Sequence, residues 1–86
     1  MVDLMYDTDK IFRKIGYSIY IIRKELKITA KELGNQVGKS ECTVTAWERG
    51  EHIPSFSSVL KVCNVFNCSI EELFNAEEYI KIKKAV

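Results

Sequence analysis

The sequence predicts an all-α fold, a bundle of five helices with short connections, and three observations support this class. Apolar residues recur every three or four positions through most of the chain, as they do on the buried face of a helix. Serine or threonine stands directly before several of these segments, where helix N-caps are preferred. The breaks between the segments are short, which favours neighbouring helices that pack locally.

The chain has 86 residues, enough for one domain with a modest core. We expect residues 1–86 to form this single domain. Its core is expected to extend from about residue 8 to residue 74, and residues 75–86 form a C-terminal tail.

The first helix is expected to begin near Thr8. Its apolar residues fall at intervals of three and four, namely Ile11 or Phe12, Ile15, Ile19, Ile22 and Leu26. Gly16 lies inside this helix and weakens it slightly. Residues 1–7 show no period and are predicted to be a loose arm.

Two short helices with a tight turn between them are predicted at the centre of the chain, at Ala30 to Val37 and at Glu41 to Arg49. Thr29 and Glu32 have the spacing of a capping box, in which each side chain satisfies a backbone amide of the other. Ser40 is a good N-cap for the second helix. This arrangement is a helix, a turn and a helix.

Glycine and proline support these boundaries. Gly38 follows the first of the two helices, where a left-handed conformation costs glycine nothing. Gly34 leaves room for a close approach by the second helix. Gly50 and Pro54 mark a loop after Trp47 and end the second helix.

Two more helices follow the loop. Ser55 caps the fourth helix, whose expected apolar stripe is Phe56, Val59, Leu60, Cys63 and Phe66. Ser69 and Glu72 form another capping box, which starts a fifth helix with Ile70, Leu73 and Phe74. The tail fits a strand or a helix equally well. With little core left to cover, it is predicted to be either a self-association element or a frayed end.

Composition excludes several function classes. The net charge of +1 creates no uniform field that would attract nucleic acid or an anionic membrane, although a local basic patch remains compatible with it. No apolar run approaches the roughly 20 residues that cross a bilayer, and the first residues lack the features of a signal peptide. These features predict a cytoplasmic protein without a membrane partner.

Metal, cofactor and catalytic sites are not expected. The three cysteines are an odd number, and Cys63 and Cys68 with a single histidine match no zinc spacing. Cys63 is interpreted as a core residue. The sequence has no Ser/His/Asp or Cys/His arrangement and no glycine-rich phosphate loop, so we predict no catalytic residues and no enzyme.

From about Ile15 to Phe74 the chain resembles the Cro and phage-repressor type of helix-turn-helix protein, the XRE family. The resemblance rests on IGYSIYIIRKELKIT, KELGNQVGKSECTVTAWERGEHIPS and VLKVCNVFNCSIEELF, with WERG and the later Pro54-Ser55 as the most recognisable part. It implies a lambda-repressor-like five-helix bundle. Helices 2 and 3 would bind DNA, and a dimer would read two half-sites about one helical turn apart.

The resemblance also assigns roles to residues. Arg23 and Glu48 would form a partly buried ion pair, in keeping with the need of a carboxylate beside a core tryptophan for a partner. The expected base-facing residues are Ser40, Glu41, Cys42, Thr43, Thr45 and Ala46. The expected phosphate contacts are Thr29, Ala30, Lys31, Lys39 and Arg49, with Asn35 and His52 as weaker candidates.

These assignments predict a sequence-specific regulator of transcription that binds double-stranded operator DNA, a repressor acting as a homodimer. Glutamine or arginine is common in the family where Glu41, Cys42 and Ala46 stand, so we expect few base-specific hydrogen bonds. This departure motivates an alternative, a protein-interaction module of antitoxin or phage-regulator type with weak or no DNA binding. A regulatory protein partner would fit either function.

Overall fold

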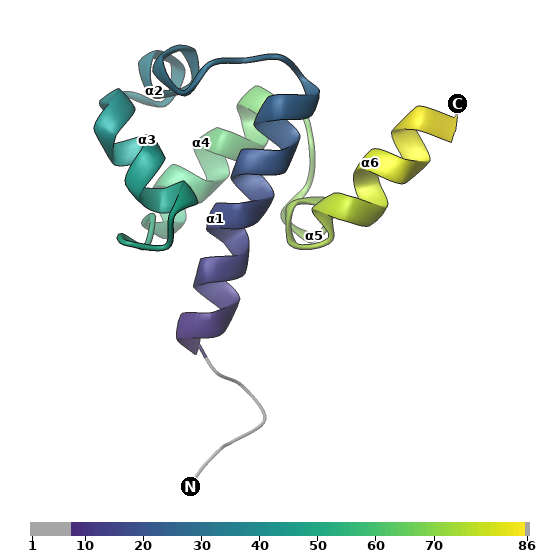
Figure 1. Cartoon of the computed structure of the whole chain (residues 1–86), viewed down its shortest axis with the longest axis horizontal. Coiled ribbons are helices and arrows are strands. Elements are labelled where there is room, and N and C mark those ends of the chain that lie inside the picture. Colours follow the sequence, from purple (N-terminus) through teal and green to yellow (C-terminus); the bar gives the residue numbers. More distant parts are fainter. Residues whose placement is uncertain (1–7, 86) are drawn as a thin grey trace, which may run out of the picture.

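The computed structural model describes residues 8–85, without the side chains of residues 8, 9, 11, 12 and 85. This part of the chain forms six helices (Figure 1). They are α1 (Thr8–Glu25), α2 (Ala30–Val37), α3 (Glu41–Glu48), α4 (Phe56–Phe66), α5 (Ile70–Phe74) and α6 (Ala76–Ala85). The predictions of a loose arm at residues 1–7 and of a buried Ile11 or Phe12 fall outside the described residues and side chains.

The core surrounds α1, which contacts α3, α4, α5 and α6. In Figure 1, α2 and α3 lie on one side of α1, and α5 and α6 lie on the other. The core side chains come from all six helices: Ile15, Ile19, Ile22, Leu33, Val37, Val44, Trp47, Val59, Val62, Cys63, Phe66, Leu73 and Ala76. The all-α class is therefore as predicted.

Local capping signals set the helix boundaries as the sequence indicated. The Thr29/Glu32 and Ser69/Glu72 capping boxes are both formed, and the Ser40 and Ser55 side chains accept from amides of the next turn. Gly38 ends α2 in the left-handed conformation, with φ 74°. The predicted boundaries of α2 are confirmed, and α3 ends at Glu48, one residue before the expected end.

Three apolar residues that were expected in the core are exposed, namely Leu26, Phe56 and Leu60. Leu26 follows the end of α1, where Lys27 adopts a positive φ and the chain turns away. Phe56 is the first residue of α4, ahead of the first buried apolar position at Val59. Leu60 lies about 100° around the helix from Val59, so Val62 is buried in its place.

The tail is a sixth helix, α6, and the expectation that it had little core to cover is wrong. Ala76 is buried, and Tyr79 and Ile80 are partly buried against the core. Ile21 of α1, next to the buried Ile22, is likewise partly buried against the core. Near its other end α6 is joined to α1 by an ion pair of 3.3 Å between Lys84 Nζ and Glu25 Oε1.

Gly16 has a larger role than the sequence indicated. A Cβ atom at this position would lie 1.9 Å from the backbone oxygen of Trp47, so only glycine lets α1 approach the end of α3 this closely. Gly34 is similar, because its Cβ would lie 2.5 Å from the Lys39 oxygen. The two glycines thus allow backbone contacts that position α3.

Among the described residues, no helix has the length and apolar character needed to span a bilayer.

Candidate nucleic-acid interface

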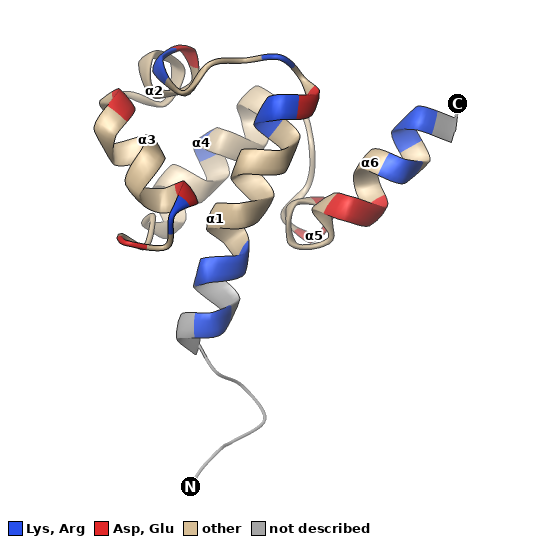
Figure 2. Cartoon of the chain, in the orientation of Figure 1, with Lys and Arg blue, Asp and Glu red and all other residues tan. Residues whose placement is uncertain are grey.

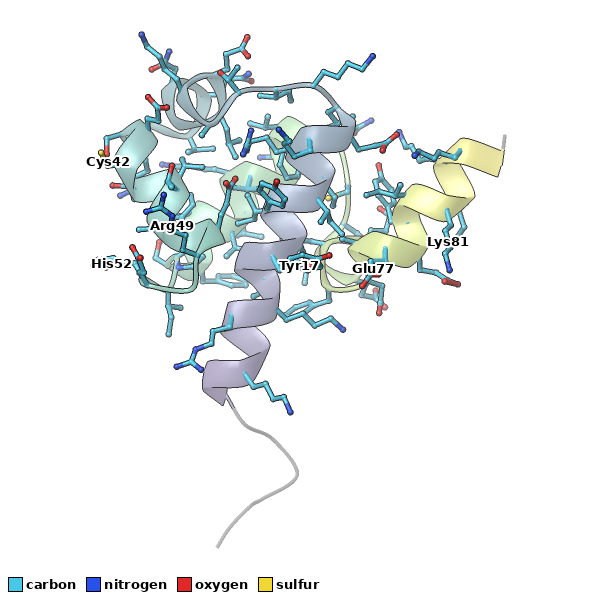
Figure 3. The ribbon with its side chains drawn as sticks, viewed as in Figure 1. Tyr17, Cys42, Arg49, His52, Glu77 and Lys81 are labelled. Atoms are coloured by element: carbon cyan, nitrogen blue, oxygen red, sulfur yellow. The ribbon has the colours of Figure 1, made fainter. Side chains whose placement is uncertain are left out.

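The candidate interface is the outer face of α3. Val44 and Trp47 anchor the helix in the core, which turns its other side chains outward. Cys42 and Arg49 lie along the outer side of α3, and His52 lies in the following loop (Figure 3). Glu41, Cys42 and Arg49 are exposed, whereas Thr43, Thr45 and Ala46 are half-buried.

The hydroxyl groups on this face are partly used within the helix. Ser40 Oγ accepts from the Thr43 amide at 3.1 Å, and the two hydroxyl oxygens are 3.0 Å apart. Thr45 Oγ1 donates to the Glu41 carbonyl oxygen at 2.9 Å. A hydroxyl proton that is already donated cannot also be given to a base. Thr45 therefore offers a lone pair and a methyl group, and Glu41 and Cys42 are the freest polar side chains.

Arg23 and Glu48 form the ion pair that the sequence predicted. Arg23 Nε donates to Glu48 Oε2 at 2.7 Å and its Nη2 donates to Oε1 at 3.0 Å. Its Nη1 donates to the Ile28 carbonyl oxygen at 2.9 Å. The side chains are only 11% and 7% exposed, and the hydrogen bond to Glu48 raises the pKa of Arg23. This pair joins α1 to the end of α3 and to the residue before the α2 cap.

The start of α2 offers backbone donors. Its capping box uses the amides of Thr29 and Glu32, so those of Ala30 and Lys31 remain for a phosphate oxygen. The hydrogen bond from the Thr29 amide lowers the pKa of the Glu32 carboxyl. Lys31 and Lys39 are exposed and lie at opposite ends of α2.

A groove of about 790 Å³ brings several of these residues together. The predicted residues in its wall are Arg23, Thr29, Ala30, Glu41, Thr45, Glu48 and Arg49. Five other lining residues were not predicted from the sequence, and all come from α1 or the turn after it: Tyr17, Tyr20, Lys24, Lys27 and Ile28. The sequence contains a pattern that could have identified three of them, because Tyr20, Lys24 and Lys27 recur at helical spacing opposite the apolar stripe of the first helix. Lys24 Nζ and Arg23 Cζ lie 5.9 and 5.6 Å from the Tyr20 ring centre.

The charges around α3 are mixed. Glu41 is at its start, and Arg49 follows Glu48 at its end (Figure 2). Glu48 is paired with Arg23, so the negative charge that α3 presents to solvent comes from Glu41 at its exposed start. The exposed cations Lys24, Lys27 and Arg49 line the groove, and the exposed Lys39 precedes the N-cap residue of α3. This arrangement suits a phosphate backbone at the edges and a contact with a base amino group at the centre.

The remaining candidate groups lie elsewhere. Cys63 lies in α4 and Cys68 in the turn before α5, and burial raises the pKa of both thiols, that of Cys68 to about 12. Such thiols are poor ligands and nucleophiles. Within residues 8–85, no group of three or more His, Cys, Asp or Glu side chains could hold a metal ion.

Comparison with known proteins gives consistent matches. A family model described as helix-turn-helix matches residues 19–73. YgzD, an uncharacterised HTH-type transcriptional regulator of Bacillus subtilis, is 35% identical over 57 residues, which cover 66% of this chain and 86% of YgzD. Repressor protein C2 of Salmonella phage P22 is 33% identical over 63 residues, 73% of this chain but 29% of the repressor's length.

Two solved structures are similar as well. The P22 c2 repressor in complex with a synthetic operator has a TM-score of 0.65 at 34% identity, covering 72% of this chain and 94% of that chain. The clp gene regulator ClgR of Corynebacterium glutamicum has a TM-score of 0.73 at 20% identity, with 87% and 81% covered. The fold is the lambda-repressor-like one that the sequence predicted, with α6 added to its five expected helices.

Proposed function

Because this chain belongs to the helix-turn-helix family of DNA-binding transcriptional regulators, the XRE family, we propose that it binds a specific operator as a homodimer and represses transcription. Repression would follow most simply from occlusion of a promoter. The family is non-enzymatic, so the proposal concerns binding alone.

The observation that carries the proposal is the way α3 is held. Trp47 and Val44 anchor its inner face, the Arg23–Glu48 pair fixes its end to α1, and its exposed start lies beside the α2 cap in one groove. A rigid helix next to free amides matches the geometry in which α3 enters the major groove while α2 contacts a phosphate. The P22 repressor, whose structure this chain matches, was crystallised with an operator.

The proposed roles divide into positioning and base contact. Thr29, Ala30, Lys31, Lys39 and Arg49 contact phosphates in this proposal, and Ser40 holds the helix start. Glu41 accepts a hydrogen bond from a cytosine amino group. Thr43, Thr45, Ala46 and Cys42 offer small or apolar contacts, including contacts to thymine methyl groups.

The test is selection from a random double-stranded DNA library at moderate salt, followed by sequencing of the bound fraction. We expect enrichment of a short site in two inverted copies. Glu41→Ala should relax the preference at one base pair of each copy. Arg49→Ala should lower affinity for all sequences alike and reduce the slope of log K against log salt by about 1.

A matched control is Glu51→Ala, which removes a carboxylate from the loop after α3 and should leave the base preference unchanged. If a correctly folded protein enriches no sequence, the proposal fails. The alternative, a protein-interaction module with a regulatory protein partner, would then be the function to test, because the unusual Glu41, Cys42 and Ala46 would face protein instead of bases.

A further inference from the structure

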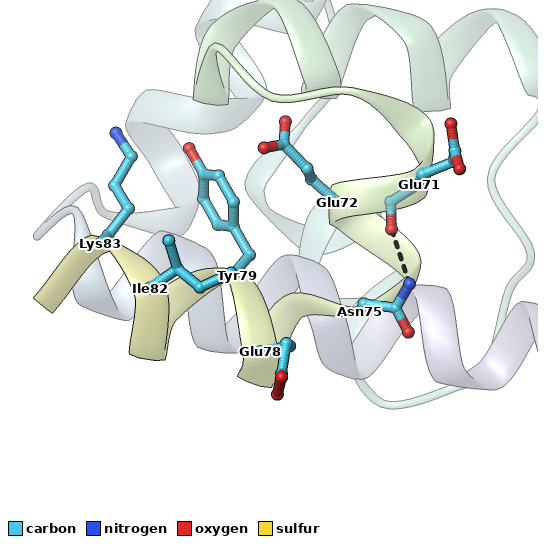
Figure 4. A pocket seen from close by; sticks show the side chains of 7 residues that line it. All are labelled: Glu71, Glu72, Asn75, Glu78, Tyr79, Ile82 and Lys83. Carbon is cyan, nitrogen blue, oxygen red and sulfur yellow. Dashed lines mark hydrogen bonds between the residues drawn. The ribbon is translucent and has the colours of Figure 1, made fainter. Parts of the chain in front are cut away.

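A second surface lies at the other end of the molecule, in a groove between α5 and α6. The groove has a volume of about 540 Å³ and is lined by Glu71, Glu72, Asn75, Glu78, Tyr79, Ile82 and Lys83 (Figure 4). Ile82 is 62% exposed, and Lys83 Nζ lies 5.5 Å from the Tyr79 ring centre. The groove thus has an apolar floor, carboxylates on its walls and a lysine at one end.

The charges of α6 are divided along its length. Its first turn carries Glu77 and Glu78, and its last turn carries Lys83 and Lys84, a separation visible in Figure 2. One residue of each sign, Glu78 and Lys83, lines the groove. Two such helices that lie antiparallel place the acidic end of each beside the basic end of the other. The same surface is then self-complementary, which a two-fold dimer interface requires.

We propose that this groove binds α6 of a second copy of the chain, in antiparallel orientation. The inference rests on the homodimer proposed above and names its interface. A two-fold axis between Tyr79 and Ile82 makes Tyr79 of each protomer contact Ile82 of its partner. The same register sets Glu78 against the partner's Lys83, so each apolar contact has an ion pair beside it.

The size of the interface predicts a weak dimer. One face of a ten-residue helix and the groove that receives it bury less than the roughly 800 Å² per partner of a standard interface. We therefore expect a dissociation constant in the micromolar range or weaker, on the order of 10 µM. DNA would strengthen the association by holding two copies side by side.

The position of α6 has a consequence for the operator. Along the 42 Å long axis of the chain, α3 and α6 lie at opposite ends (Figure 1). Dimerisation through α6 leaves the two α3 helices at the far ends of the pair, more than one DNA turn of about 34 Å apart. Since half-sites on one face of DNA are separated by whole turns, the geometry predicts a centre-to-centre spacing of about two turns, in place of the one turn that the family resemblance implies.

The first experiment is a charge exchange in the full-length chain, followed by sedimentation at several concentrations. Glu78→Lys and Lys83→Glu each set like charges against one another, and each should weaken dimerisation about ten-fold or more. The double variant Glu78→Lys/Lys83→Glu restores opposite charges and should recover most of the affinity. Circular dichroism would show that each variant keeps its helices.

The matched controls are Glu77→Lys and Lys81→Glu. They change the same charges on the same helix, but neither residue lines the groove, and both should leave the dimer affinity within about two-fold. Rescue by the double variant together with silent controls supports the proposal. A wild-type chain that stays monomeric to several hundred micromolar overturns it. So does a dimer that ignores both exchanges but is lost on Phe56→Ser, at the exposed start of α4.

A second measurement separates this inference from the proposed function. Operator fragments with two copies of the selected site at one-turn and two-turn spacings are titrated with wild type and with Glu78→Lys. Cooperative binding only at two turns, lost in Glu78→Lys while binding to a single copy persists, supports the α6 interface. Cooperative binding at one turn that Glu78→Lys leaves intact overturns it, although sequence-specific DNA binding would stand.

Discussion

The α2–α3 pair and the α5–α6 pair begin in the same way and are then packed differently. Each opens with a capping box, Thr29/Glu32 in one case and Ser69/Glu72 in the other. In the first pair the backbones meet closely at Gly34, and an ion pair fixes the far end to α1. In the second pair a single residue joins the helices, and an open groove with an exposed Ile82 remains.

This difference separates two requirements. A helix that reads DNA must be held rigidly so that its side chains meet the base edges in one register. A helix that binds another copy of itself must leave apolar surface free until the partner arrives. The close packing of the inner side of α3 and the exposed apolar groove beside α6 fit these two tasks.

The largest expected effect is at Gly16, where α1 meets the end of α3. Gly16→Ala places a Cβ atom 1.9 Å from the Trp47 oxygen, and a backbone atom cannot move aside as a flexible side chain would. We expect a loss of at least about 3 kcal/mol in the free energy of unfolding, measured with urea. Lys14→Ala, at an exposed site on the same helix, should change it by less than about 0.5 kcal/mol.

If Gly16→Ala were nearly neutral, the close approach of α1 to α3 would not be a constraint. The α2–α3 side would then be as adaptable as the α5–α6 side, and the contrast between the two pairs would fail.

The ion pair comes next. Glu48→Gln leaves the partly buried Arg23 guanidinium without its carboxylate, at an expected cost of about 2 to 3 kcal/mol. The loss should be smaller for the solvent-exposed pair of Lys84 with Glu25, where Glu25→Gln should cost less than about 1 kcal/mol. Urea unfolding of the two variants measures both. Equal losses would mean that burial does not distinguish the two pairs.

The sequence was sufficient for the α2–α3 pair because its signals are local. A capping box starts α2 and Gly38 ends it, and each signal depends on residues within one turn. The Arg23–Glu48 pair spans distant parts of the chain, and its identification needed the family resemblance together with the place of Glu48 beside Trp47.

The errors arose where a residue's environment depends on distant parts of the chain. The period of the tail allowed a strand or a helix, and it did not show that Tyr79 and Ile80 pack against the core formed by the other helices. Gly16 could not be distinguished from a mildly unfavourable glycine until Trp47 was found beside it. The engaged hydroxyl of Thr45 was also hidden, because a threonine can donate to its own helix or to a ligand.

The two capping boxes allow a matched comparison of two variants that should each lose about 1 kcal/mol of folding stability. Thr29→Ala and Ser69→Ala each remove a side-chain oxygen that accepts from a helix amide, and each should cost about 1 kcal/mol of stability. Only Thr29→Ala should also weaken binding to the selected DNA, measured by fluorescence anisotropy under conditions where both variants are folded. A similar loss of DNA affinity in Ser69→Ala would place part of the DNA contact on α5.

The smallest expected effect concerns pH and the carboxyl of Glu32. Its pKa is lowered in the folded chain, chiefly by the hydrogen bond from the Thr29 amide. Below the ordinary carboxyl pKa of about 4.3 the unfolded state therefore binds more protons than the folded state. The stabilisation is fully present above that pH and is lost as the pH falls through the lowered value. Glu32→Gln should be less stable than wild type at pH 7. Urea unfolding at lower pH should show a smaller difference in the free energy of unfolding between the two proteins. A difference in stability that stays constant with pH would mean that the charge of Glu32 contributes nothing to the α2 cap. The start of α2 would then be capped by the Thr29 hydroxyl alone, as the start of α3 is capped by Ser40.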